Sequence, residues 1–171
     1  YFLSGNESAH DIIVMMLNRF EQIYNESLKD YVDSTGYTLD QIVTVASMVE
    51  SEAKLDEERP IIAGVIYNRL AIDMPLQIDS TVQYALSTRN EVVTESDLEV
   101  DSPYNTYKNK GLPAGPICNP GKASLLGALN PEKHNYYYYV LKEQGGSEHY
   151  FAENYEDFLE AKAQYQATFT S

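Results

Sequence analysis

The stretch DSPYNTYKNKGLPAGPICNPG, residues 101–121, constrains the fold of this 171-residue chain more than any other. Proline cannot donate a backbone hydrogen bond and glycine weakens both helices and strands, so neither element can run through this stretch. Four of its residues are prolines, at positions 103, 113, 116 and 120. Its tyrosines and asparagines favour an ordered loop, and long ordered loops in compact domains are often functional.

Helices are predicted on both sides of this loop. Residues 8–29 have helical periodicity, and Gly36 breaks the chain after them. Thr38 and Gln41 form a T-x-x-Q capping box that predicts the start of a second helix, and Pro60 predicts the start of a third that runs to Leu70. Shorter or later helices are expected over 80–86, 122–129 and 155–167, whereas 88–101 reads as acidic and irregular.

The C-terminal part contains a strand signal. The segment YYYYVLKEQGGSEHYFA has aromatic residues on both sides of Gly145-Gly146, a pattern typical of a β-hairpin. The sequence therefore predicts an α+β fold, a mainly helical domain with a long ordered Pro/Gly-rich loop and a C-terminal β-hairpin. We expect one domain over residues 1–171, because a chain of this length suits a single core.

Composition narrows the classes of function. A formal net charge of −14 and a pI near 4.4 disfavour nucleic acid as a partner, since such binding depends on Lys and Arg. The single cysteine, Cys118, excludes an intrachain disulfide and most thiolate metal sites. His10, His134 and His149 are far apart, and no known metal motif is present, so we expect neither a metal nor a cofactor.

Two glutamates stand in the predicted helix VASMVESEAK, residues 45–54. Residues two apart on a helix are rotated by about 200°, so Glu50 and Glu52 cannot act as a pair. Glu50 borders the apolar stripe formed by Val45, Ala46 and Val49, whereas Glu52 lies in a segment that looks solvated. On periodicity alone, a surface charge is the simpler interpretation of either residue.

Two kinds of catalysis could use residues of this helix. Ser51-x-x-Lys54 matches the nucleophile motif of penicillin-binding enzymes, but S-D-N and K-T-G are absent. Glycoside cleavage fits better, because it needs a carboxylic acid beside an apolar wall and a groove of aromatic and hydrogen-bonding groups. Glu50 is the candidate acid. The candidate substrate-binding residues are Gln77, Asp79, Tyr104, Asn105, Tyr107 and Asn119.

Five motifs in fixed order carry a resemblance to a known family: ASMVESEA, YNRL followed by MPLQIDSTVQYA, DSPYNTY, GLPAGPICNPG and ALNP. Over about residues 38–151 the chain resembles the YceG-like endolytic murein transglycosylases. The resemblance implies a bacterial lyase that cuts peptidoglycan glycan strands between N-acetylmuramic acid and N-acetylglucosamine and leaves 1,6-anhydro ends. It also implies that Glu50 is the catalytic residue. The departures are small: Ser51, Ser80 and Ala114 stand where the family often has Lys, Pro and Pro.

The resemblance also predicts context. Family members usually carry an upstream membrane helix and a LysM-like domain, so we expect an excised catalytic portion of a protein anchored in the cell membrane and facing the wall. Glycan strands are then the expected partner, together with cell-wall synthesis enzymes, while the membrane is reached only through the missing anchor.

Two alternatives stay open at this point. The chain could be a peptidoglycan-binding module without activity, or a muramidase-type hydrolase that activates water with Asp79 or Asp101. Each candidate residue also has a plain structural interpretation. Asp79 could cap the next helix, Asp101 could form an Asx-type turn, and Tyr104, Asn105 and Asn119 could simply fix the loop.

Overall fold

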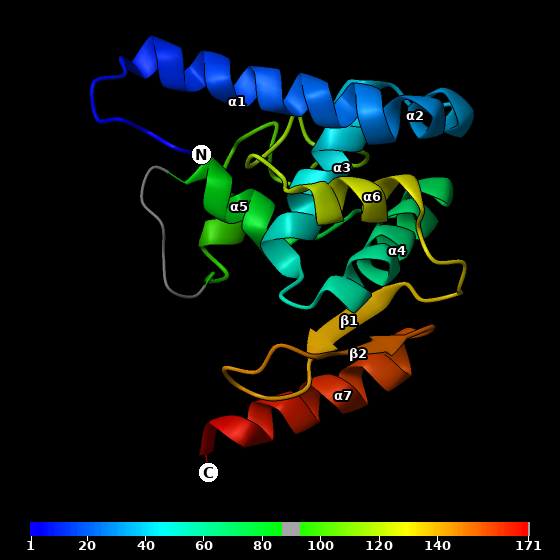
Figure 1. Cartoon of the computed structure of the whole chain (residues 1–171). Helices are drawn as coiled ribbons and strands as arrows, with labels where there is room; N and C mark the ends of the chain where they lie inside the picture. Colours follow the sequence, from blue (N-terminus) through cyan, green and yellow to red (C-terminus); the bar gives the residue numbers. More distant parts are fainter. Residues whose placement is uncertain (87–92, 171) are drawn as a thin grey trace. The chain divides into compact units, whose positions relative to one another are not determined.

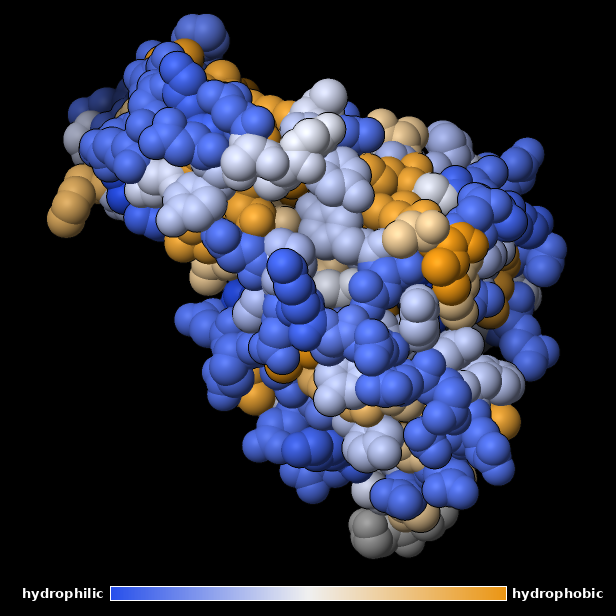
Figure 2. All heavy atoms as spheres, turned by 90° about the vertical axis from the view of Figure 1, so that its right-hand side faces the viewer, coloured by the Kyte–Doolittle hydropathy of each residue, from blue (hydrophilic) through white to orange (hydrophobic). Residues whose placement is uncertain are grey.

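The computed structural model describes residues 1–86 and 93–170 and contains two compact units, residues 1–37 and residues 38–171. Part of the segment predicted to be irregular, residues 88–92, lies outside the described residues. On the face shown in Figure 2, most exposed residues are hydrophilic, as the strongly acidic composition leads one to expect.

The first unit is helical. It comprises α1 (Ala9–Ile23), a π-helical turn η1 (Tyr24–Leu28) and α2 (Lys29–Thr35). A capping box between Ser8 and Asp11 starts α1, and Gly36 ends α2 in the left-handed conformation with φ 76°. The predicted helix over 8–29 is confirmed and continues to Thr35, since Gly36 is the first residue that stops it. No residue of α1 is buried.

The second unit is built on three helices that pack against one another, α3, α4 and α6 (Figure 1). The T-x-x-Q box starts α3 as predicted, with Thr38 and Gln41 exchanging both capping bonds. The helical elements of this unit before the hairpin are α3 (Leu39–Glu52), η2 (Asp56–Glu58), α4 (Arg59–Ala71), α5 (Asp79–Ala85), η3 (Asp97–Glu99) and α6 (Lys122–Leu129).

The core of the second unit lies between these helices. Its side chains are almost fully buried and mostly aliphatic, so removal of apolar surface from water stabilises the packing. The largest apolar ones are Ile42, Met48, Ile62, Ile66, Leu76, Leu125, Val45, Val49, Val65 and Val82.

The predicted hairpin and final helix complete the unit. Strands β1 (Tyr138–Leu141) and β2 (His149–Ala152) pair antiparallel, with Tyr138 opposite Ala152 and Leu141 opposite His149. The helix α7 (Tyr155–Ala167) packs on both strands and is followed by η4 (Thr168–Thr170) (Figure 1). The α+β class is therefore confirmed.

A buried pair joins the hairpin to the helices. Glu58 Oε1 accepts a 2.8 Å bond from the His149 backbone N–H, and Glu58 Oε2 lies 2.6 Å from His149 Nδ1. Both side chains are nearly inaccessible to solvent. Because every polar atom in these bonds is buried, the pair fixes where the hairpin attaches beside α4.

Candidate active site

Glu50 lies in the last turn of α3, and its carboxyl group is bound by donors from two other segments. Oε2 accepts hydrogen bonds from Ser124 Oγ at 2.5 Å, the Gly121 N–H at 3.2 Å and Arg59 Nη1 at 3.3 Å. Among the described residues no donor reaches Oε1. The Glu50 side chain keeps 34% of its surface exposed, so solvent reaches part of it.

The hydrogen-bond donors to the Glu50 carboxyl group lie at the N-terminal ends of two helices. Gly121 is the N-cap of α6 and Ser124 lies in its first turn, so the partial positive charge of the α6 N-terminus faces the carboxyl group. Arg59 is the first residue of α4. Its Nη1 also donates to Ser124 Oγ at 2.6 Å, and its Nε donates to Asp56 at 2.9 Å. The result is a fixed network rather than a freely rotating glutamate.

Sequence reasoning missed Arg59 and Ser124. Ser124 carries no signal, since a serine in the first turn of a helix is ordinary. Arg59 carries a weak one, because a cation at a helix N-terminus is opposed by the helix dipole and calls for a compensating partner. Here Glu50 and Asp56 are those partners.

Glu52 requires a correction, because it was predicted to be solvated and is half-buried. Its Oε2 accepts a 3.2 Å bond from the hydroxyl of Tyr139 on β1. Burial raises the pKa of the Glu52 carboxyl, and the nearby charge of Asp79 adds to that rise, while the bond from the Tyr139 hydroxyl acts against it. Periodicity failed here because the hairpin covers a helix face that would otherwise be exposed.

The segment 77–79 and the long loop contact each other. Gln77 is exposed and adopts φ 50°, a left-handed conformation that is uncommon for a residue with a side chain. It is held there by the loop: the Gln77 N–H donates to Thr106 O at 3.1 Å, and the Ile78 N–H donates to Thr106 Oγ1 at 3.0 Å. Strained backbone that the surroundings enforce is typical of functional segments.

Asp79 and Tyr107 form the closest side-chain contact in this region. The Tyr107 hydroxyl donates to Asp79 Oδ1 at 2.5 Å, and burial together with this bond raises the pKa of Tyr107. Asp79 stands at the first position of α5 but makes no side-chain cap, so the capping interpretation is wrong. Its carboxylate is exposed and already fixed in direction.

Asn105 must be reassigned. It is completely buried, with its amide donating to Leu98 O and Val100 O and its Oδ1 accepting from the Tyr107 N–H. These bonds use its polar atoms, which contradicts direct contact with a substrate. Of the two interpretations open from the sequence, the structure supports fixing the loop.

The remaining candidates lie on the surface of the loop. Tyr104 is half-buried and packs on the ring of Tyr84, with centroids 4.7 Å apart. Asn119 is exposed two residues before Gly121, which binds Glu50. Asp101 is exposed as well. Among the hydrogen bonds of the described residues, none joins Tyr104 or Asp101 to the Glu50 carboxyl group.

The S-x-x-K motif of Ser51 and Lys54 does not bring its serine and lysine together as a nucleophile and its base. Ser51 Oγ donates to Ser47 O at 3.0 Å, while the Lys54 ammonium donates to Gly146 O at 2.9 Å. Ser51 and Lys54 thus serve different partners. Across residues 1–86 and 93–170, no group of histidine, cysteine and carboxylate side chains is arranged to hold a metal ion.

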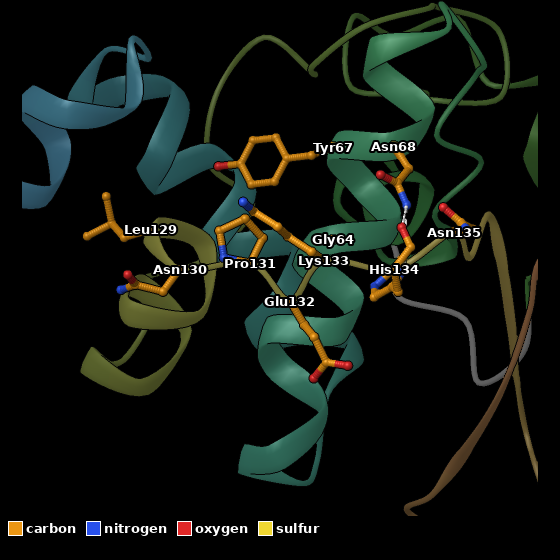
Figure 3. Close-up of a pocket in the computed structure, with 10 residues that line it drawn as sticks. All are labelled: Gly64, Tyr67, Asn68, Leu129, Asn130, Pro131, Glu132, Lys133, His134 and Asn135. Carbon is orange, nitrogen blue, oxygen red and sulfur yellow. Dashed lines mark hydrogen bonds between the residues drawn. The ribbon is translucent and has the colours of Figure 1, made fainter.

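A pocket of about 710 Å³ lies elsewhere in the second unit, between α4 and the segment after α6 (Figure 3). Its polar groups are largely committed to the protein: the Asn68 amide donates to His134 O and Tyr136 O, and His134 Nε2 bonds Ile61 O. Gly64 allows this closeness, since a Cβ there would lie 2.5 Å from His134 Nε2. The pocket does not include Glu50.

The fold described above is that of a known class of protein. The profile of the YceG-like family matches residues 1–164, and the chain belongs to this family. Its sequence is 40% identical over 164 residues to an endolytic murein transglycosylase of Bacillus subtilis (strain 168), covering 96% of this chain and 45% of that protein. It is 35% identical over 156 residues to a protein of the same name from Streptococcus pneumoniae (strain ATCC BAA-255 / R6), covering 88% and 27%.

A solved structure agrees. The crystal structure of a YceG-like protein from Listeria monocytogenes superposes with a TM-score of 0.83 at 40% identity, covering 93% of this chain and 50% of that one. The chain therefore spans about half the length of these proteins, or less. Within the described residues, no helix is both long enough and apolar enough to cross a membrane.

Proposed function

We propose that this chain is the catalytic portion of an endolytic murein transglycosylase, with Glu50 as the single acid and base. The substrate is a peptidoglycan glycan strand, cut between N-acetylmuramic acid and N-acetylglucosamine to leave a 1,6-anhydro end. The observation that carries this proposal is the asymmetry of the Glu50 carboxyl group, which has three donors on Oε2 and leaves Oε1 for the substrate.

The unequal hydrogen bonding of the two carboxyl oxygens of Glu50 suits proton donation. Oε2 keeps its bonds to Ser124 and Gly121 when the carboxyl group is neutral, so the proton belongs on Oε1. From there it passes to the glycosidic oxygen as the bond from that oxygen to C1 breaks, and N-acetylglucosamine leaves with a free 4-hydroxyl group. The positive charge that develops at C1 is stabilised by the 2-acetamido group of the same sugar.

The second step returns the proton. The 6-hydroxyl group of the muramic acid attacks C1, and Oε1 of the Glu50 carboxylate accepts the proton that this hydroxyl releases. Arg59 is poised for this stage, because its guanidinium lies 3.3 Å from Oε2 and forms an ion pair with the carboxylate. No water is consumed, and the donor network returns to its starting state.

The exposed groups beside the loop suit the sugar. Gln77 and Asp79 present an amide and a carboxylate on a backbone fixed by Thr106, and Tyr107 fixes the direction of the Asp79 carboxylate. We assign Gln77 and Asp79 to substrate binding, with Tyr107, Tyr104 and Asn119 as neighbouring contacts. Since murein lies outside the cytoplasm, we place the reaction there, whereas membrane attachment and wall-synthesis partners are expectations from the family resemblance.

The test is mass spectrometry of isolated, uncrosslinked glycan strands incubated with the chain and with its Glu50→Gln variant. Gln keeps an acceptor for Ser124 and Gly121 but cannot donate and accept the catalytic proton. We expect products lighter than hydrolytic ones by one water molecule, formed only by the unmodified chain. Products of hydrolytic mass would move the assignment to a muramidase, and cleavage by Glu50→Gln at the normal rate would refute the role of Glu50.

A further inference from the structure

Arg69 of α4 holds the connector between α4 and α5, residues 72–78, from the inside of the protein. Its Nη1 donates to Leu76 O at 2.6 Å and to Pro75 O at 3.2 Å. The oxygen of Leu76 belongs to the peptide group that leads into Gln77, whose side chain is exposed. The guanidinium therefore fixes the backbone directly beside a proposed substrate-binding side chain.

Arg69 is nearly inaccessible to solvent, yet it forms no ion pair with any residue that the structure describes. Carbonyl oxygens meet its charge, including Tyr137 O, which accepts a 2.6 Å bond from Nε. Its Cζ also lies over the ring of Tyr138 on β1, 5.2 Å from the centroid. A buried cation is costly unless it is well bonded, so a guanidinium bonded to backbone carbonyl groups is suited to holding that backbone in place.

The peptide groups on both sides of Gln77 are fixed. The group before it donates its N–H to Thr106 O at 3.1 Å and offers its carbonyl oxygen, that of Leu76, to Arg69. In the group after it, the Ile78 N–H donates to Thr106 Oγ1 at 3.0 Å. Because both peptide planes are held, Gln77 keeps φ 50°, a conformation that a residue with a side chain leaves when nothing enforces it.

We propose that Arg69 is a positioning residue for substrate binding: through Leu76 O it keeps Gln77 in the left-handed conformation that presents its amide to the glycan strand. The inference rests on the proposed function for its substrate. Arg69 itself is buried and does not touch the sugar. Where nothing holds it, the left-handed form is disfavoured by about tenfold or more, so a chain without the Arg69 contact should bind about tenfold more weakly.

The first variant is Arg69→Lys, because lysine keeps the charge but lacks the planar fork that reaches the connector and the hairpin at once. The Kd for uncrosslinked glycan strands is measured in the Glu50→Gln background, where the proposed function predicts no cleavage. We expect Arg69→Lys to bind about tenfold more weakly. The matched control Arg19→Lys changes an exposed arginine of α1 and should bind normally. An unchanged Kd for folded Arg69→Lys would overturn the inference.

The variant Gln77→Gly separates positioning from a general structural role. Glycine adopts positive φ without strain, so in a Gln77→Gly background Arg69 has little left to enforce. Arg69→Lys should then change the Kd by less than about twofold. An equal loss of binding with and without Gln77→Gly would show that Arg69 supports the fold at large, which would overturn the inference.

The conformation of Gln77 can also be followed without any substrate. Backbone coupling constants measured by NMR report its φ, which should be near 50° in the unmodified chain and negative in Arg69→Lys. A folded Arg69→Lys protein that keeps positive φ at Gln77 would overturn the inference, whatever the strands do. Strands that never bind the unmodified chain would refute the proposed function, and the change in φ would then support the hold of Arg69 on Gln77 alone.

The variant Tyr138→Leu covers the case in which Arg69→Lys does not fold. It removes the ring beneath the guanidinium and leaves Arg69 in the chain, so the hold on Gln77 should weaken only in part. We expect the Kd to rise by about two- to fivefold, and this rise should disappear in the Gln77→Gly background. A Tyr138→Leu protein with an unchanged Kd and an unchanged φ at Gln77 would overturn the inference.

Discussion

The hydroxyl oxygen of Ser124 lies 2.5 Å from Oε2 of Glu50, across 74 positions of sequence. The same hydroxyl accepts a bond from Arg59 Nη1 at 2.6 Å, so Ser124 links the Arg59 guanidinium to the Glu50 carboxyl group. Together with Gly121 and Arg59, this short side chain at the start of α6 therefore sets which carboxyl oxygen of Glu50 faces the protein.

Replacement of Ser124 by alanine should lower activity without unfolding the protein. The change removes the shortest of the three donors on Oε2 and leaves Arg59 Nη1 with one acceptor fewer, so the carboxyl group loses its fixed orientation. We expect kcat on glycan strands to fall by roughly tenfold, with KM little changed, because one hydrogen bond to a charged group is lost at the reacting centre.

The control for this change is Ser34→Ala, which removes an exposed serine of α2 whose hydroxyl donates to Tyr31 O. Both variants should show the circular dichroism spectrum of the unmodified chain. A Ser124→Ala protein with undiminished kcat would show that the network does not orient Glu50.

Two glycines should respond in opposite ways to alanine. At Gly64 a Cβ would lie 2.5 Å from His134 Nε2 and 2.6 Å from Glu132 O, and a backbone oxygen cannot easily move. Alanine gains up to about 1 kcal/mol of helix propensity there, but overpacking costs about 1–3 kcal/mol, so we expect a net loss of stability.

At Gly121 the same change meets only ordinary contacts, with Glu50 Oε2 at 3.6 Å and Oε1 at 3.9 Å. Gly121→Ala should therefore lose less stability than Gly64→Ala, since its cost is that of a poorer N-cap, while its methyl group narrows the approach to Oε1 and lowers the cleavage rate. Urea unfolding and a cleavage assay on both variants check this pair. Stable Gly64→Ala protein together with fully active Gly121→Ala protein would contradict both arguments.

Local signals in the sequence predicted the elements well, and tertiary contacts explain the misses. The T-x-x-Q box, the prolines and the aromatic strands act within a few residues, so α3, the long loop and the hairpin were predictable. Glu52 was misjudged because helical periodicity cannot foresee that the hairpin folds back over one face of α3.

The residues of the candidate site also divide into those that the sequence could select and those that it could not. Glu50 was selected by the family resemblance, whereas the partners of its carboxyl group come from helix starts far away in sequence, which no local pattern can bring together. Asn105 shows the converse error. A polar residue in a functional loop resembles a ligand contact in sequence, although its amide donates to the carbonyl groups of Leu98 and Val100, just before the loop.

Stability should depend on pH through Glu52. The pKa of this carboxyl group is raised in the folded protein above its ordinary value of 4.5, chiefly by burial. Above pH 4.5 the unfolded chain ionises at Glu52 while the folded chain still holds the proton, so the folded state binds more protons. The contribution of Glu52 to the free energy of unfolding is therefore complete below pH 4.5 and is lost as pH rises through the folded pKa.

Urea unfolding of the chain and of Glu52→Gln at a series of pH values from 4.5 upward measures this contribution. Gln cannot ionise, so the difference in stability between the two proteins should shift in favour of Glu52→Gln as the pH rises. All other titrating groups are common to both proteins and cancel in the difference. Parallel curves over the whole range would mean that Glu52 has the same pKa in the folded and unfolded chains.

Replacement of Glu58 by alanine should detach the hairpin from the helices. Glu58 binds both the backbone N–H and the ring of His149, and both side chains are nearly inaccessible, so the change leaves two buried donors without a partner. We expect the free energy of unfolding to fall by about 2–5 kcal/mol, since each unpaired buried group costs about 1–3 kcal/mol. The matched control Glu57→Ala changes the exposed neighbour and should cost less than about 0.5 kcal/mol.

Because β1 also carries Tyr139, the partner of Glu52, hydrogen exchange in Glu58→Ala should quicken first across β1 and β2 and reach the end of α3 before it reaches the helical core. Uniform exchange across the whole second unit would show that the hairpin and the helices unfold as one, and that the pair adds stability without holding the hairpin separately.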